Sequence, residues 1–237
     1  MFLLKNNVRK EIKFKVFIKD IGKFYSWLLN SPFKKSYEDR RVNSLYYDTY
    51  NLDFANDNIT GLSKRIKIRA RWYSKYDQNF LNDFCKDKNF KFEVKRKVNN
   101  LSDKVLLSEV SCNKEDTFLE RQNFLKKKLN QAISNYSKIS KLLLRNIIFV
   151  GYKREYYQHF FSPNIRLTID KDIACSISNQ LPNSKKPIIS NNYIIVEFKF
   201  EYNMEKLVTQ LLKNFPFRRI RSSKYLYALS KYYRFSY

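Results

Sequence analysis

The chain has 237 residues, of which 43% are hydrophobic, so it can fold around a substantial core. Lysine and arginine number 47 against 22 aspartate and glutamate residues, and the resulting formal net charge of +25 predicts a polyanionic partner. Three scattered glycines, one histidine and three isolated cysteines exclude a glycine-rich phosphate loop, a two-histidine zinc site and a disulfide framework.

Strands are predicted where apolar and charged residues alternate, and helices where apolar residues recur every three or four positions. Polar stretches predict loops. All these elements belong to a single predicted domain over residues 1–237. In chain order they are strand 8–17, helix 18–29, strand 65–72, loop 74–89, strand 90–97, helices 114–135 and 137–145, strand 165–170, loop 176–192, strand 194–201, and helices 204–214 and 223–233.

No apolar run approaches the ~20 residues that a membrane-spanning helix needs. The first residues are too few for a signal peptide. We therefore expect a cytoplasmic protein whose basic surface could bind peripherally to an anionic membrane or to a membrane protein.

The predicted strands differ from ordinary half-buried strands in the charge of their polar faces. Between residues 65 and 72, one face carries four cations in a row, and the other face is apolar; the four cations are Arg65, Lys67, Arg69 and Arg71. A solvated face normally mixes both signs of charge with neutral polar residues. An ordinary sheet with its charged side in water remains the simplest interpretation of any single strand.

Taken together, the charged faces are explained better if they converge on a highly charged anion. The sequence predicts an α+β fold in which an antiparallel β-barrel has helices packed outside and a water-filled cationic interior. Lys199 belongs to the same set of inward cations. Three carboxylates, Glu11, Glu93 and Glu197, share the cationic faces, where they could hold a divalent metal that bridges phosphate oxygens.

Motifs along nearly the whole chain resemble, in the same order, the VTC (vacuolar transporter chaperone) catalytic domain. This family is the polyphosphate polymerase branch of the CYTH-like triphosphate tunnel metalloenzymes. The matching motifs are RKEIKF at 9–14, RRVNSLYYDT at 40–49, DNITG at 57–61, KRIKIRARWY at 64–73, FEVKRK at 92–97, YKREYY at 152–157, IRLTID at 165–170, IIVEFKF at 194–200 and RSSKY at 221–225.

The resemblance implies an ATP-dependent transferase that adds the γ-phosphoryl group of ATP to a growing polyphosphate chain, with bound Mn²⁺ or Mg²⁺. It places the metal on Glu197 and an aromatic ring against the nucleotide base at Tyr152. Further substrate-binding residues would be Lys104, Arg221 and Ser223. The implied catalytic cations are Lys13, Arg69, Arg71, Lys95, Arg154, Arg166 and Lys224.

Two other functions stay open at this stage. The same interior could admit water as the nucleophile, which would make the protein a tunnel triphosphatase acting on triphosphate or nucleoside triphosphate. The protein could also be a noncatalytic polyanion-binding module, although no nucleic-acid motif is present and nucleic acid is not an expected partner. The single ExK of the first strand, where triphosphatase relatives have ExExK, favours the polymerase.

Three further residues are assigned structural roles. Asp48 and Asp57 are predicted to serve turns and helix caps. The lone His159 is predicted to lie at a strand end or in the core.

Overall fold

The computed structural model describes residues 9–75, 84, 89–113, 115–134, 136, 139–178, 188–190 and 192–233. The strands of this part of the chain are β1 (Arg9–Phe17), β2 (Phe33–Asp48), β3 (Lys64–Ser74), β4 (Asn89–Val98), β5 (Leu101–Ser111), β6 (Arg145–His159), β7 (Arg166–Ile177), β8 (Ile188–Ser190), β9 (Tyr193–Glu201) and β10 (Arg219–Ile220). The α-helices are α1 (Ile21–Leu29), α2 (Asp53–Ile59), α4 (Phe118–Ile133), α5 (Glu205–Leu211) and α6 (Lys224–Ser230).

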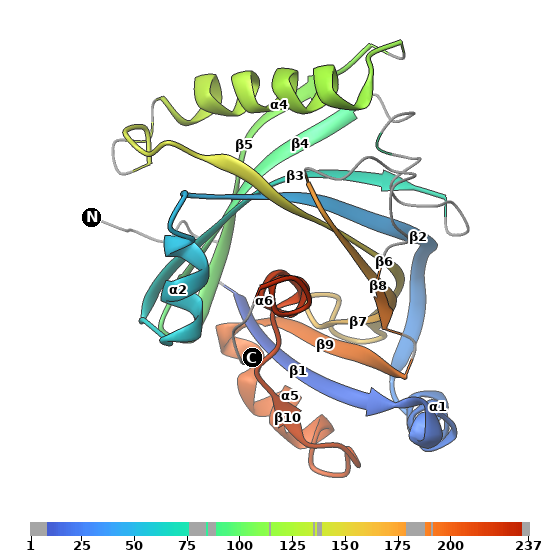
Figure 1. Cartoon of the computed structure of the whole chain (residues 1–237). Helices are drawn as coiled ribbons and strands as arrows, with labels where there is room; N and C mark the ends of the chain where they lie inside the picture. Colours follow the sequence, from blue (N-terminus) through green and yellow to red (C-terminus); the bar gives the residue numbers. More distant parts are fainter. Residues whose placement is uncertain are drawn as a thin grey trace.

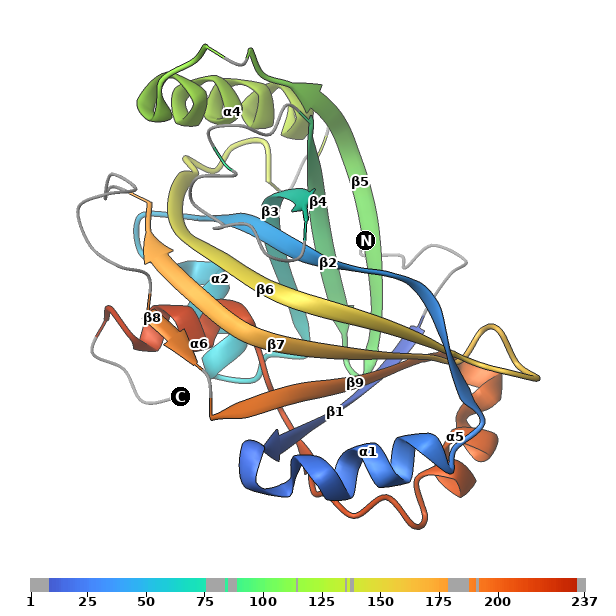
Figure 2. The ribbon, with the colours of Figure 1, turned by 90° about the vertical axis from the view of Figure 1, so that its right-hand side faces the viewer.

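The long strands pair antiparallel in a closed ring (Figures 1 and 2). The order around the ring is β1, β9, β7, β6, β2, β3, β4 and β5. The ring closes where β5 returns to β1 through a single residue pair, Arg9 with Ser102. The short strand β8 pairs with β7, and the short strand β10 pairs with β1. The predicted α+β fold with antiparallel strands closed around an interior is confirmed.

Two hydrophobic clusters cover the ring from outside. In one, the apolar faces of β3 and β4 pack with α4 through residues such as Trp72, Phe92 and Leu125. In the other, β1, β7 and β9 pack with α1 and α5. Figure 1 shows α4 on one side of the ring and α1 with α5 on the other. Strand alternation then turns the charged faces of these strands toward the interior.

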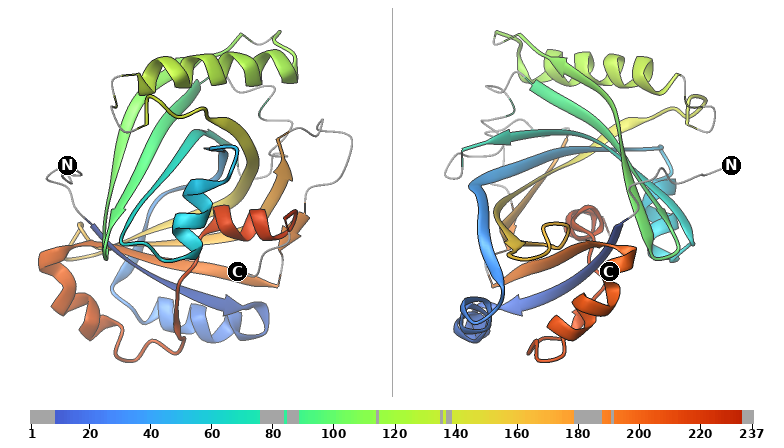
Figure 3. Two further views of the ribbon diagram at one scale, coloured as in Figure 1. Left: turned by 60° about the vertical axis from the view of Figure 1, so that its left-hand side comes forward. Right: turned by 180° about the vertical axis from the view of Figure 1, so that it is seen from behind.

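A third cluster fills one end of the interior. Its α6 side chains, including Tyr225 and Leu226, pack against Val42, Val150 and Ile195 of the surrounding strands. Figure 3 shows α6 beside α2 at this end of the ring. The predicted outer position of the helices holds for α1, α4 and α5, whereas α6 packs into the end of the ring.

Asp48 ties α2 and α6 together at the same end. Its Oδ1 accepts hydrogen bonds from the backbone N–H groups of Thr49 and Phe54. Its Oδ2 accepts bonds from the Ala55 N–H and the Tyr225 hydroxyl. The predicted capping role of Asp48 is confirmed.

The predicted helix over 137–145 is wrong. Residues 139–144 form turns, and Arg145 already begins β6. Ile139 and Leu144 do enter the core, but Leu143 between them is 80% exposed, so their spacing belongs to a packed turn.

The two predicted loops lie largely outside the described residues. Most of 74–89 is in this group, whereas the 176–192 segment contains the end of β7 and the short strand β8. His159 is buried at the end of β6, as predicted. Cys112 and Cys175 are buried free thiols. No helix in the described part of the chain is long and apolar enough to cross a bilayer.

Candidate active site inside the strand ring

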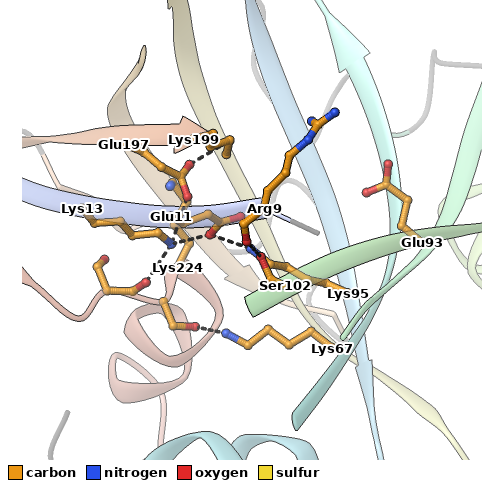
Figure 4. Close-up of polar contacts among 12 residues, drawn as sticks. Arg9, Glu11, Lys13, Lys67, Glu93, Lys95, Ser102, Glu197, Lys199 and Lys224 are labelled. Atoms are coloured by element: carbon orange, nitrogen blue, oxygen red, sulfur yellow. Dashed lines mark hydrogen bonds and ion pairs between the residues drawn. The ribbon is translucent and has the colours of Figure 1, made fainter. Parts of the chain in front are cut away.

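Contacts between strands that are not neighbours show that the charged faces meet inside the ring. The Lys95 ammonium group on β4 lies 2.6 Å from a carboxylate oxygen of Glu11 on β1, across the intervening β5. Lys67 on β3 donates a hydrogen bond of 2.7 Å to the Ser223 hydroxyl, which caps α6. Figure 4 shows these side chains pointing toward one another.

One group of interior charges surrounds Glu93 of β4, which is 1% exposed. Arg69 donates from Nε and Nη2 to Glu93 Oε2 at 3.0 and 2.8 Å. Arg71 lies 3.6 Å from the same oxygen, and Lys104 donates to Oε1 at 2.8 Å. Burial raises the pKa of Glu93, but Arg69, Arg71 and Lys104 outweigh it and hold the pKa at about 2.

A second group contains Glu197 of β9. The carboxylate of Glu197 lies 3.3 Å from Lys13, 3.0 Å from Lys199 and 3.4 Å from Arg154. Burial raises the pKa of Glu197, but the three cations lower it well below its ordinary value. Lys13 also lies 3.9 Å from Glu11, so this lysine connects the two carboxylates.

Asp170 of β7 joins the second group, although the sequence analysis did not select it as a site residue. Arg154 donates to the two oxygens of Asp170 from Nε and Nη2, the latter at 2.7 Å, and Lys224 at the start of α6 forms an ion pair with it. The alternation along β7 could have identified Asp170, because Arg166, Thr168 and Asp170 lie on the same face of the strand.

Tyr152 of β6 lies between these cations. The Lys224 ammonium nitrogen is 4.6 Å and the Arg154 guanidinium carbon 5.0 Å from the centre of its ring. Burial raises the pKa of Tyr152, but Arg154 and Arg71 bring it down to about 8. Tyr152 thus lies where the apolar end of the interior meets the ionic part.

The structure brings most of the predicted site residues into this interior. These are Glu11, Lys13, Lys67, Arg69, Arg71, Glu93, Lys95, Lys104, Tyr152, Arg154, Glu197, Lys199, Ser223 and Lys224. Arg65 lies near the N-terminal end of β3, where it continues the cationic face beyond Lys67. Arg166 and Arg221 are exposed, Arg166 at the first position of β7.

Arg40 of β2 shares the Tyr73 ring with Arg71 and was not among the predicted site residues. Its guanidinium carbon lies 4.1 Å from the centre of the Tyr73 ring and 5.1 Å from that of Tyr156. Irregular register between β2 and β6 near Lys35, Tyr37 and Arg40 breaks the alternation that would have revealed it.

The described carboxylates do not form a metal site on their own, and a metal there would need oxygens of the substrate as further ligands. Figure 4 places Glu11 and Glu197 together near Lys13, with Glu93 at a distance from them. The described residues contain no cluster of three or more metal-ligating side chains. Mg²⁺ is commonly bound by one or two carboxylates together with substrate phosphates and water. Glu197 and Glu11 match that arrangement, whereas Glu93 belongs to a separate group.

A closed antiparallel ring around opposed cations and a few carboxylates is suited to the binding of a highly charged anion. The VTC domain family matches residues 2–233, and the chain belongs to this family. The predicted membership of the VTC domain family is thereby confirmed. No curated protein matches the chain.

Several solved structures are similar to the chain over most of its length. A candidate adenylate cyclase from Vibrio parahaemolyticus has 12% sequence identity and a TM-score of 0.50, over 93% of this chain and 98% of that one. A candidate adenylate cyclase from Bacillus halodurans has 14% identity and a TM-score of 0.49, over 95% and 98% of the two chains. The Mimivirus capping enzyme triphosphatase has 12% identity and a TM-score of 0.38, over 87% of each.

Proposed function

We propose that this protein is an ATP-dependent polyphosphate polymerase that transfers the γ-phosphoryl group of ATP to the end of a polyphosphate chain. The observation that carries the proposal is the meeting of Arg69, Arg71, Arg154 and Lys224 inside one ring, each held by a buried carboxylate. The proposal also rests on membership of the VTC domain family.

Phosphoryl transfer needs positioning and charge stabilisation more than it needs a strong base. In its loose transition state, negative charge spreads over the equatorial oxygens of the transferred group. Arginine forks bind phosphate through two parallel hydrogen bonds, and lysines add point charges. The carboxylates of Glu93 and Asp170 hold the arginines in place before substrate arrives, so little reorganisation is needed during the reaction.

The nucleophile of a polymerase is a phosphate oxygen that is already anionic. This is consistent with a site that uses no histidine: His159 lies at the end of β6, where its Nδ1 accepts a hydrogen bond from the Ser162 N–H. Mn²⁺ or Mg²⁺, held by Glu197 with Glu11 beside it, would neutralise charge on the β and γ oxygens of ATP.

The direct test is to incubate the purified protein with ATP and Mn²⁺ and to separate the products. We expect ADP together with polyphosphate. Orthophosphate without polymer at any time would reject the polymerase and identify a triphosphatase. Binding of ATP or polyphosphate without turnover, with affinity that falls steeply with salt, would identify a noncatalytic polyanion-binding module.

The variant Glu197→Gln tests whether the Glu197 carboxylate takes part in the reaction. We expect loss of metal-dependent turnover by at least about a hundredfold, as for other preorganised electrostatic groups. The matched control is Glu109→Gln, because the Glu109 carboxylate pairs with Lys91 in an exposed ion pair. Normal activity of Glu197→Gln would remove Glu197 from the site.

A further inference from the structure

The turn between β6 and β7 presents two adjacent phenylalanines to solvent. Phe160 is 56% and Phe161 is 79% exposed, and neither belongs to the hydrophobic clusters of the described residues. The Phe160 N–H donates to the Pro32 carbonyl oxygen at 2.8 Å, so the turn lies beside the segment that joins α1 to β2. Leu29, the last residue of α1, is 85% exposed. Figure 2 shows the β6–β7 turn projecting beyond the neighbouring strands, with the C-terminal end of α1 on the same side.

Hydrogen bonds fix the backbone of this turn. The Ser162 N–H donates to His159 Nδ1 at 3.0 Å. The His159 N–H donates to the Ile165 carbonyl oxygen at 3.0 Å, and the Ile165 N–H donates to the Ser162 carbonyl oxygen at 2.9 Å. The rings of Phe160 and Phe161 meet edge to face with their centres 4.9 Å apart. These two residues and Leu29 are here called the apolar tip, and grouped exposed apolar residues of this kind mark an interaction surface.

The chain segments that carry the apolar tip contain cations but no carboxylates. Neither residues 21–37 nor residues 156–169 include an aspartate or a glutamate. Their cations are Lys23, Lys34, Lys35 and Arg166. The ammonium nitrogen of Lys34 lies 4.4 Å from the centre of the Phe160 ring. The protrusion is thus apolar at its tip and basic in the segments around it.

We infer that the apolar tip docks this protein on an anionic lipid bilayer, with the phenylalanine rings in the interface and Lys34 on lipid phosphates. Apolar side chains beside cations are the combination that binds interfacially to anionic membranes. A projecting turn can enter a fluid bilayer without a preformed groove to receive it. The formal net charge of +25 attracts the whole molecule to an anionic surface before contact is made.

The position of the apolar tip decides which end of the ring would face the bilayer. Strand β6 begins at Arg145, opposite Asp48, which holds α2 and α6. The same strand ends at His159, beside the tip. Docking would therefore bring the end of the ring opposite α6 toward the membrane surface. Attachment at the tip is independent of the reaction inside the ring, so it does not rest on the proposed function.

The first test is co-sedimentation of the protein with vesicles of equimolar phosphatidylcholine and phosphatidylserine. For F160S/F161S we expect at least about a tenfold loss of affinity, because the exposed rings lose their burial in the interface. This variant leaves the net charge unchanged, so long-range attraction cannot account for the loss. The matched control is L119S/L143S, since Leu119 of α4 and Leu143 before β6 are exposed leucines away from the tip. This control should bind as the wild-type protein does.

A tryptophan placed in the tip locates the contact. Vesicles of the same composition with bromine in their acyl chains quench tryptophans that enter the bilayer. We expect F161W to be quenched more than the wild-type protein, whose Trp27 and Trp72 give the background in every variant. L143W, the matched control, should show no additional quenching. Melting temperatures check the fold of each variant, and F161W keeps the test decisive if F160S/F161S does not fold.

The contribution of Lys34 is tested with K34Q. Its affinity for the vesicles should fall more than that of K127Q, which removes the same charge from α4. Equal effects of the two substitutions would overturn the contact between Lys34 and lipid phosphates.

Three outcomes would overturn docking at the tip. One is equal vesicle binding by F160S/F161S and the wild-type protein, and another is equal quenching of F161W and L143W. The third is self-association of the wild-type protein in sedimentation velocity that F160S/F161S abolishes, because it would assign the tip to a contact between two copies of the chain.

Discussion

At the scale of single residues, the interior carboxylates hold cations together that would otherwise repel one another. Glu93 contacts Arg69, Arg71 and Lys104, and Asp170 contacts Arg154 and Lys224. A buried ion pair is expensive to desolvate, and its replacement by apolar residues is often neutral or favourable for stability. The presence of these groups in a lumen therefore indicates a functional requirement for fixed positive charge.

Substitution of Glu93 should make the cost of unpaired cations measurable. Glu93→Gln keeps the shape of the side chain but leaves Arg69, Arg71 and Lys104 without their carboxylate. We expect the free energy of unfolding to fall by about 3 kcal/mol, as for other buried pairs that lose one partner. Denaturant unfolding measures the change. Glu109→Gln, in an exposed pair with Lys91, should change stability by less than about 1 kcal/mol.

A comparison of the wild-type protein with Glu93→Gln also gives a prediction about pH. The pKa of Glu93 is lowered from its ordinary 4.5 to about 2, so its stabilising effect is complete above pH 4.5. The effect is lost as the pH falls from 4.5 toward 2, because the folded protein then resists protonation that the unfolded chain accepts. The wild-type protein should therefore lose more stability over this range than Glu93→Gln. Parallel pH profiles for the two proteins would contradict this role of Glu93.

At the scale of elements, α6 and α2 are held at the end of the ring by one buried carboxylate. Asp48→Asn replaces an acceptor with an amide nitrogen that faces the Ala55 N–H and the Tyr225 hydroxyl, which both donate. Leaving buried donors unsatisfied should cost about 2 kcal/mol, whereas Tyr225→Phe should cost about 1 kcal/mol. Thermal and denaturant unfolding measure both.

Asp57→Asn is the control for Asp48→Asn, since Asp57 lies on the same helix α2 and outside this hydrogen-bond network. Its effect should be within about 0.5 kcal/mol. If Asp48→Asn were as stable as the wild-type protein, the coupling of α2 to α6 would depend on apolar packing alone.

The elements differ in how far the sequence could predict them. Alternation identified the interior faces of β1, β3, β4 and β9, because a strand with one apolar face can bury it in only one way. It could not predict that β5 returns to β1 through one residue pair, since closure depends on strand tilt and register. The packing of α6 into the end of the ring was likewise out of reach, because its apolar face fits an outer or an inner position equally well.

The sequence could predict which charged residues line the interior, but it could not predict which of them contact one another. The cations of β3 follow from a period of two. The register with β4 decides that Arg69 lies opposite Glu93, whereas Arg65 and Lys67 lie opposite lysines. The pairing of Arg154 with Asp170 requires β6 and β7 to be neighbours, which alternation alone does not specify.

At the scale of the whole molecule, the closed ring brings cations from many strands around one interior, where they outnumber the carboxylates. Low-dielectric walls on all sides strengthen the positive potential of the interior for a long anion. A ligand that binds the folded state alone stabilises it by linkage, by about 2.7 kcal/mol at a concentration about 100 times its dissociation constant. For a domain of this size, that corresponds to a rise in melting temperature of about 5 to 10 °C.

Long-chain polyphosphate should therefore raise the melting temperature by this amount, and orthophosphate at the same total phosphate concentration should raise it much less. The difference arises because one long chain can contact the cations around Glu93 and those around Glu197 simultaneously, whereas separate phosphates must each give up their translational freedom. Differential scanning fluorimetry at two salt concentrations checks the prediction, and the shift should shrink at the higher concentration. An unchanged melting temperature in excess polyphosphate, or an equal rise with orthophosphate, would mean that the cations act separately and that the ring does not bind a continuous chain.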